Sequence, residues 1–151
     1  MPKEPIAELE LPATGGKPFS MKDHRKHPLV IYFYPKDNTP GCTTEAMQFR
    51  DLYEEFTKAG AQIFGVSRDS LKSHDNFKAK FSLPFELISD PEETACALFN
   101  VIKMKNMYGK QVRGIERSTF VFDAKGKLVK EWRGVKVPGH VQEVLDFIRS
   151  L

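Results

Sequence analysis

One cysteine stands at a point in the chain where its side chain could do chemistry. Cys42 lies in the sequence TPGCTTE, after a loop rich in proline, aspartate and asparagine. Thr39 is a good N-cap residue and Pro40 suits the first helical position, so the pattern predicts that Cys42 lies in the first turn of a helix. Unpaired amides and the helix dipole favour an anion there. Because the thiolate is the nucleophilic form of cysteine, Cys42 is the candidate nucleophile.

The neighbours of Cys42 bear on whether it is reactive or structural. A lone cysteine is often a small buried hydrophobe, but the residues before Cys42 are loop formers and no apolar stripe includes it. Glu45 opposes a thiolate, because it lies three residues on, on the same helical face, and its charge disfavours a second anion unless a cation holds it. The pattern favours a reactive cysteine.

The bulk composition predicts one globular domain over residues 1–151. The chain has 40% hydrophobic and 28% charged residues, and its net charge of +3 comes from basic and acidic residues that are interleaved. That pattern is not typical of nucleic-acid binding. No apolar run approaches the roughly 18 residues that would span a bilayer, and the start MPKEPIAELELP lacks the apolar core of a signal peptide. We therefore expect a cytoplasmic protein that binds neither nucleic acid nor membrane.

The cysteine and histidine content limits the metal and disulfide chemistry that is expected. The chain has two cysteines and four histidines, without the spacing of CxxC or HxxxH motifs. They predict neither a disulfide framework nor a metal site. A reduced compartment fits this content, and cysteine chemistry here is expected to be catalytic rather than structural.

Strands and helices alternate along the first two thirds of the chain, and the last third predicts a hairpin and a helix. This order is typical of an α/β sandwich around a mixed β-sheet flanked by helices. The 90–101 helix is predicted to have Asp90 as its N-cap and Pro91 in its first position. The predicted elements are an N-terminal β-hairpin over 7–23, strands over 28–34, 61–67 and 84–89, helices over 40–59, 70–82 and 90–101, a hairpin over 117–134 and a helix over 140–151.

The sequence around Cys42 resembles a known family. PKDNTPGC matches the Pro-x-x-x-Thr-x-x-Cys signature of peroxiredoxins, and YFYPKDNTPGCTTEAMQFRD is similar to their bacterioferritin comigratory protein branch, also called PrxQ. The likeness continues in order through GVSRDS, SHDNFKAKF, LISDPE, NMYGK and RSTFVFDAKGK, over nearly the whole chain. It implies a thioredoxin-like fold in a single AhpC/TSA-type domain. It also implies a monomeric peroxidase that reduces hydrogen peroxide and organic hydroperoxides with thioredoxin or another thiol reductant, without metal, haem or flavin.

The resemblance also implies a role for five residues. Cys42 matches the peroxidatic cysteine, which attacks the peroxide and becomes a sulfenic acid. Thr39 is similar to the threonine that hydrogen-bonds the peroxide and the thiolate, and Pro35 to the proline that shields the pocket from water. Arg117 matches the arginine that stabilises the thiolate and the leaving oxygen, and Glu45 resembles the acid that orients this arginine. Without the resemblance, Arg117 would be interpreted as an exposed charge.

A second, resolving cysteine is missing from its usual places. Many members of this branch carry it five residues after the first cysteine, where this chain has Met47, and others carry it in the following helix, near residues 77–79. Cys96 remains as a possible resolving residue, reached by local unfolding, or as a core residue of its helix. Our hypothesis is that Cys42 carries the chemistry and that Cys96 is structural or at most a slow resolver. An engineered chain that lacks its resolving cysteine is a further alternative.

Three other functions share some of these features. A thioredoxin-like disulfide reductase requires a CxxC pair, but Glu45 stands at the second position. A cysteine hydrolase would pair Cys42 with His74 or His140, which are in no recognisable motif and are interpreted as surface helix residues. A thioredoxin-like redox or binding module without peroxidase turnover is the alternative outside catalysis, and it predicts that Cys42→Ser leaves function intact.

Overall fold

The computed structural model describes residue 6, residues 8–24 and residues 26–151. Residues 1–5 of the predicted domain and Ala7, the first residue of the predicted hairpin, lie outside this description. Within it, no helix is both long and apolar enough to pass through a bilayer. The elements in chain order are β1 (Glu10–Leu11), β2 (Phe19–Ser20), a 3-10 helix η1 (Met21–His24), β3 (Leu29–Phe33), α2 (Pro40–Asp51), α3 (Tyr53–Lys58), β4 (Gln62–Ser67), α4 (Leu71–Phe81), β5 (Glu86–Ser89), α5 (Thr94–Leu98), β6 (Ile102–Met107), β7 (Lys110–Ile115), β8 (Ser118–Phe122), β9 (Leu128–Arg133) and α6 (His140–Arg149).

A five-stranded mixed sheet forms the centre of the molecule, as predicted. Its strand order is β5-β4-β3-β8-β9. Strand β3 runs parallel to β4 and antiparallel to β8, and every residue of β3 and β8 is buried. The run of apolar residues in β3 suits a strand that is covered on both faces. The predicted N-terminal hairpin is also present, with β1 and β2 antiparallel.

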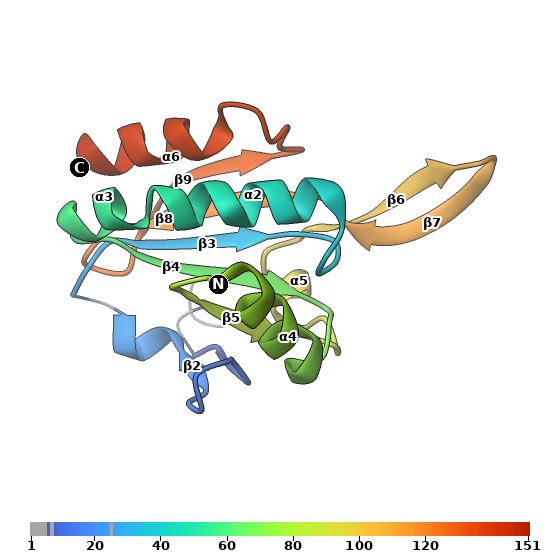
Figure 1. Ribbon diagram of the computed structural model, residues 1–151, viewed down its shortest axis with the longest axis horizontal. Helices are drawn as coiled ribbons and strands as arrows, with labels where there is room; N and C mark the ends of the chain where they lie inside the picture. Colours follow the sequence, from blue (N-terminus) through green and yellow to red (C-terminus); the bar gives the residue numbers. More distant parts are fainter. Residues whose placement is uncertain (1–5, 7, 25) are drawn as a thin grey trace.

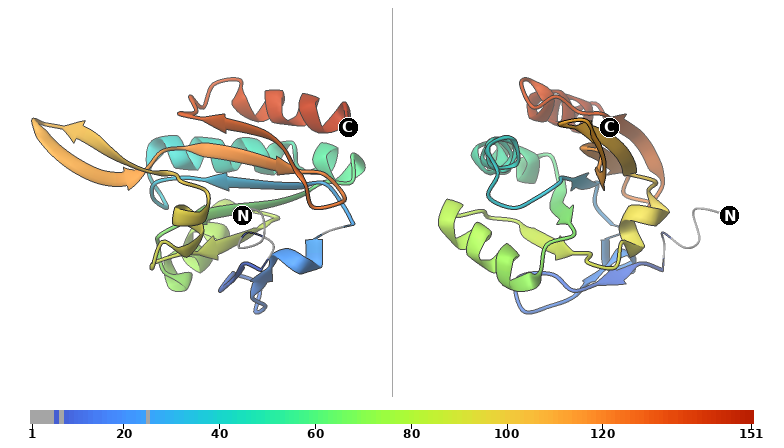
Figure 2. Two further views of the ribbon diagram at one scale, coloured as in Figure 1. Left: turned by 180° about the vertical axis from the view of Figure 1, so that it is seen from behind. Right: turned by 90° about the vertical axis from the view of Figure 1, so that its right-hand side faces the viewer.

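Helices cover one face of this sheet, and a short helix and the N-terminal segment cover the other (Figures 1 and 2). Side chains alternate along β3, so that Val30 and Tyr32 pack with residues of α2, α4 and α6, which we call the helical face. Leu29, Ile31 and Phe33 pack with α5 and the N-terminal segment, which we call the opposite face. The two cysteines belong to different faces.

Two predicted helices differ from the observed ones. The first is interrupted at Leu52, although hydrogen bonds from Leu52 N to Gln48 O and from Phe56 N to Leu52 O continue across the break. Helix α5 begins at Thr94 rather than at Pro91, so that its predicted start was wrong. Glu93 rather than Asp90 stands at the N-cap position, but the buried carboxylate of Asp90 accepts hydrogen bonds from the amides of Thr94 at 2.7 Å and Cys96 at 2.9 Å.

Strands β6 and β7 form a hairpin that projects from the body of the molecule (Figure 1) and that the sequence patterns did not predict. Tyr108 and Gly109 connect the strands with φ angles of 54° and 79°. Left-handed backbone at both central residues is typical of a tight hairpin turn. This hairpin leads directly to Glu116 and Arg117, which precede β8.

Candidate active site

The start of α2 places Cys42 at one end of the central sheet. Thr39 precedes the helix with an extended backbone and Pro40 occupies the first turn, as predicted. The Thr39 hydroxyl makes no capping hydrogen bond to the helix amides and donates instead to the main-chain oxygen of Lys36 at 2.8 Å. Because the hydroxyl proton of Thr39 is engaged in this bond, the Thr39 oxygen can act only as an acceptor for a further partner. Pro35 lies half-buried in the same loop.

Cys42 faces inward from the first turn of α2. Its residue exposure is only 3%, and it packs in the core of the helical face, which the loop-like sequence around it did not indicate. Neighbouring residues therefore cover Cys42 almost completely.

Arg117 reaches Cys42 from a different part of the chain. Ser118 pairs with Phe33 at the end of β3 that leads into the active-site loop, so that Arg117 lies beside the start of α2. Its Nη2 donates to Cys42 Sγ at 3.4 Å and its Nη1 to Glu45 Oε1 at 2.7 Å. The structure therefore brings together Cys42, Glu45 and Arg117, three of the predicted site residues.

Glu45 is fully buried beneath the site. One of its carboxylate oxygens binds Arg117, and the other, Oε2, has no hydrogen-bond partner among the described residues. Burial raises the pKa of this carboxyl to about 7, although Arg117 acts to lower it. Burial also acts to lower the pKa of Arg117, but Glu45 and Cys42 outweigh it and the net pKa is raised. The guanidinium thus remains charged between two acidic groups.

Tyr32 is a site neighbour that the sequence reasoning missed. Its ring stacks on Phe49 of α2, with centroids 4.5 Å apart, and its hydroxyl has no partner within the described part of the chain. Burial, followed by the charges of Glu45 and Cys42, raises its pKa well above the ordinary value. The apolar strand around Tyr32 indicated that its side chain is buried, because side chains alternate between the two faces of a sheet. No pattern in the sequence indicated that Tyr32 lies close to Glu45.

Both histidines of the hydrolase alternative are buried, so their interpretation as surface residues was wrong. His74 is fully buried on α4, and His140 bonds Thr119 Oγ1 at 2.8 Å through Nε2. Burial lowers the pKa of His140 to about 4. Neither ring has a hydrogen bond to Cys42 among the described contacts. The spacing of His74 with Phe77 and Phe81 on one helical stripe was the signal for its burial.

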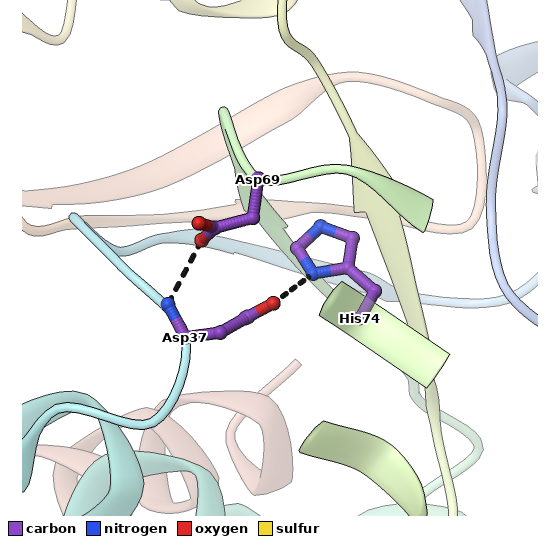
Figure 3. Close-up of side chains that lie close together, drawn as sticks. All are labelled: Asp37, Asp69 and His74. Atoms are coloured by element: carbon purple, nitrogen blue, oxygen red, sulfur yellow. Dashed lines mark hydrogen bonds and ion pairs between the residues drawn. The ribbon is translucent and has the colours of Figure 1, made fainter. Parts of the chain in front are cut away.

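His74 belongs to a polar network beside the active-site loop (Figure 3). Its Nδ1 lies 2.7 Å from Asp37 Oδ2, and Asp69 Oδ2 accepts from the amide of Asp37 at 2.8 Å. Potential ligand atoms of these three residues lie within 4.8 Å of one another. The facing atoms already hydrogen-bond one another and nearby donors, so the arrangement fits a hydrogen-bonded network better than a cation site.

Cys96 lies on the opposite face of the sheet from Cys42. It is completely buried among residues of α5 and β3, and both cysteines are free thiols. Burial raises the pKa of the Cys96 thiol strongly, and a hydrogen bond with Asp90 adds to this effect. A disulfide requires Cα atoms within roughly 7 Å, whereas these residues pack in separate clusters on opposite faces of the sheet. The structure does not bring Cys96 to the site.

Known proteins share both the sequence and this architecture. Residues 2–131 match the AhpC/TSA family. Peroxiredoxin Bcp of Xanthomonas campestris is 56% identical over 148 residues, which cover 97% of this chain and 92% of the relative. Peroxiredoxin Bcp of Bacillus subtilis is 48% identical, with 95% and 92% covered. A solved structure of Xanthomonas campestris peroxiredoxin Q has a TM-score of 0.91 at 56% identity and covers 95% of this chain and 91% of its own.

The fold and these relatives define the class of protein. A thioredoxin-like mixed sheet carries a cysteine at a helix start against an arginine, and relatives of this high identity are peroxiredoxins. The protein is a thiol-dependent peroxidase. It belongs to the AhpC/TSA family, in the bacterioferritin comigratory protein or PrxQ branch.

Proposed function

We propose that Cys42 is the cysteine that attacks the peroxide and that Arg117 is its principal electrostatic partner. The observation that carries the proposal is the guanidinium that contacts Cys42 Sγ and Glu45 Oε1 together at the start of α2. A fixed cation beside the sulfur favours the thiolate and afterwards the negative charge on the departing oxygen.

The first half of the cycle oxidises Cys42. The thiolate attacks one peroxide oxygen, a sulfur–oxygen bond forms, and the oxygen–oxygen bond breaks. The departing oxygen takes the electron pair of that bond and a proton to become water or an alcohol, and Cys42 becomes a sulfenic acid. The Thr39 oxygen accepts the hydrogen bond of the peroxide, because its own proton binds Lys36 O, and Pro35 limits access of water. Glu45 holds the guanidinium in place.

The second half of the cycle uses external thiols. One thiol displaces water from the sulfenic acid and forms a mixed disulfide with Cys42, and a second thiol releases Cys42 as the oxidised donor leaves. The burial of Cys96 on the opposite face supports a one-cysteine cycle. Thioredoxin, glutaredoxin and small thiols are the candidate donors, and a reduced compartment such as the cytoplasm would supply them. The monomeric state that the resemblance implies stays a prediction.

The substrates we propose are hydrogen peroxide and organic hydroperoxides. A solved structure of the 56% identical bacterioferritin comigratory protein of Xanthomonas campestris concerns its alkyl peroxide reduction activity, studied with trapped intermediate and ligand complexes. That relative supports organic hydroperoxides as substrates of this chain.

The test is a peroxide-consumption assay with dithiothreitol, thioredoxin and glutaredoxin as alternative donors, on the native protein and on Cys42→Ser and Cys96→Ser. We expect Cys42→Ser to lose turnover with every donor, because the nucleophile is gone. Cys96→Ser should turn over within about twofold of the native protein, since it is remote from the site. Retained turnover in Cys42→Ser would show that Cys42 is not the cysteine that attacks the peroxide.

A further inference from the structure

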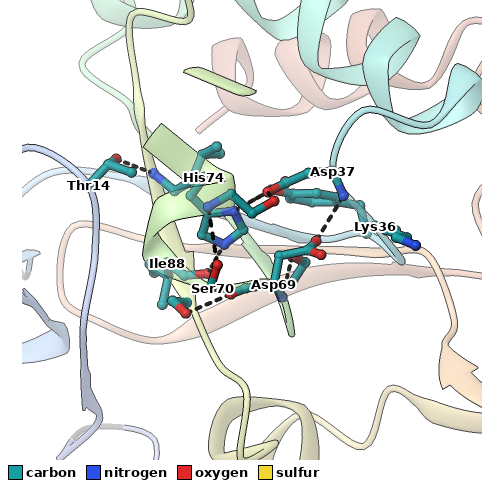
Figure 4. A network of polar contacts seen from close by, with 12 residues as sticks. Thr14, Lys36, Asp37, Asp69, Ser70, His74 and Ile88 are labelled. Carbon is teal, nitrogen blue, oxygen red and sulfur yellow. Dashed lines mark hydrogen bonds and ion pairs between the residues drawn. The ribbon is translucent and has the colours of Figure 1, made fainter. Parts of the chain in front are cut away.

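The loop between β3 and α2 is attached to the body of the molecule through one buried carboxylate. Asp37 is only 7% exposed, and it lies midway between Pro35 and Thr39. Its Oδ1 accepts from the Tyr34 hydroxyl at 2.6 Å, and its Oδ2 accepts from the Ser73 hydroxyl at 2.8 Å and faces His74 Nδ1 at 2.7 Å. Figure 4 shows the wider network, which joins this loop to α4 and β5.

The hydrogen bonds of His74 determine how many protons His74 and Asp37 hold together. Its Nε2 lies 2.9 Å from the main-chain oxygen of Ile88, which can only accept, so Nε2 carries a proton. Its Nδ1 faces a carboxylate oxygen, and a hydrogen bond there requires a second proton between the two atoms. The buried Asp37–His74 pair therefore holds one proton more than a neutral imidazole beside a carboxylate.

The remaining groups around the pair fix the sign of its pH dependence. The Tyr34 hydroxyl stays a donor, because burial and then the charges of Tyr32 and Asp37 raise its pKa well above the ordinary value. Asp69 adds a second carboxylate, Ser73 is uncharged, and Lys72 and Lys80 of α4 line the same cavity as Asp37. Loss of one proton would set a lone pair of the His74 ring against Asp37 Oδ2 or against the main-chain oxygen of Ile88, and either contact is unfavourable in a buried site.

We propose that the Asp37–His74 pair is a proton-dependent clamp on the active-site loop and that His74 is a positioning residue for the peroxidase reaction. Closed, the clamp holds Pro35 and Thr39 beside Cys42 for the peroxide step. Because Cys42 is only 3% exposed, the clamp opens when a thiol donor reaches the oxidised sulfur. The effect of the clamp on catalysis rests on the proposed function, whereas its effect on the loop does not.

Two substitutions of Asp37 separate the contact from its proton. Asp37→Asn keeps the shape, and its amide donates to a neutral His74 Nδ1 and to the Ser73 oxygen without the shared proton. Asp37→Ala removes the contact. Ser73→Ala is the matched control, because it removes an uncharged donor to the same oxygen and leaves the proton in place. Thermal unfolding confirms that each variant is folded.

Hydrogen exchange of the Asp37 amide, which bonds Asp69 Oδ2, and of the Thr43 amide, which bonds the main-chain oxygen of Thr39, measures loop opening between about pH 6 and 9 after correction for the intrinsic pH dependence. We expect protection in the native protein and in Ser73→Ala to fall as pH rises, by at most about tenfold per pH unit for one proton. Asp37→Asn should stay protected with a flat profile, and Asp37→Ala should be unprotected throughout. In stopped-flow assays, Asp37→Ala should react more slowly with peroxide and its sulfenic acid faster with dithiothreitol.

The proposal is overturned by a flat profile in the native protein, by a profile of Asp37→Asn that falls like the native one, or by unchanged half-reactions in Asp37→Ala. Exchange data give their answer even if the native protein consumes no peroxide. If the loop opens with pH but the native protein consumes no peroxide, the proposed function is wrong and the clamp is not.

Discussion

Arg117 interacts with two acidic groups through a single positive charge. Its guanidinium binds Glu45 at 2.7 Å and Cys42 Sγ at 3.4 Å, so an ionised Glu45 competes with the thiolate for the same cation. The raised pKa of Glu45, about 7, reduces this competition. At the scale of single residues, the protonation of Glu45 and the charge on Cys42 are therefore coupled through Arg117.

Glu45→Gln tests this interpretation through stability. The folded protein, with a Glu45 pKa of about 7 against an ordinary 4.5, binds this proton more tightly than the unfolded chain does. Its stabilising contribution is complete below about pH 4.5 and is lost as pH rises to about 7. We expect the free energy of unfolding of the native protein, relative to Glu45→Gln, to fall across this window by at most about 1.4 kcal/mol per pH unit.

Urea unfolding of both proteins at several pH values gives this difference, and the groups that they share cancel. A difference that is constant or that rises with pH would mean that Glu45 is ionised throughout.

The start of α2 is the element that sets the distance between sulfur and guanidinium. Gly41 stands directly before Cys42, and a Cβ at Gly41 would lie 3.2 Å from Arg117 Nη2. That separation is closer than an ordinary van der Waals contact, so a side chain at this position requires the guanidinium to shift by a few tenths of an ångström. The small residue in the motif is thus explained by the approach of Arg117.

Gly41→Ala should slow the reaction with peroxide by about tenfold, because the displaced guanidinium stabilises the transition-state charge less well. Its melting temperature should be unchanged or slightly higher, since alanine suits a helix better than glycine. Thr44→Ala, an exposed change on the same helix, is the control. Stopped-flow kinetics at one pH provide the rates of the reaction with peroxide. If Gly41→Ala reacts as fast as the native protein, the position of the guanidinium does not depend on a glycine at this position.

The sequence predicted the elements better than it predicted the contacts between them. Local signals, such as the apolar run of β3 and the Thr-Pro-Gly start of α2, identified both elements correctly. The start of α5 was predicted too early, because the capping carboxylate of Asp90 acts across an intervening turn. Contacts such as Glu45 with Arg117, 72 residues apart, depend on the pairing of β3 with β8, which no local pattern contains. The resemblance alone indicated that pair.

At the scale of the whole molecule, the sheet separates the two cysteines. Cys42 packs on the helical face with α2, α4 and α6, and Cys96 packs on the opposite face with α5. A disulfide between them would require at least one of these buried clusters to open. This arrangement supports the hypothesis that Cys96 is structural or at most a slow resolver.

The central claim, that Cys42 is the cysteine oxidised by peroxide, can be tested directly. The protein is oxidised with one equivalent of hydrogen peroxide, sulfenic acid is trapped with dimedone, and the products are located by non-reducing peptide mass spectrometry. We expect a dimedone adduct on Cys42, an unmodified Cys96 and no disulfide between them at low protein concentration. An abundant Cys42–Cys96 disulfide, or an adduct on Cys96 with Cys42 unmodified, would contradict this expectation.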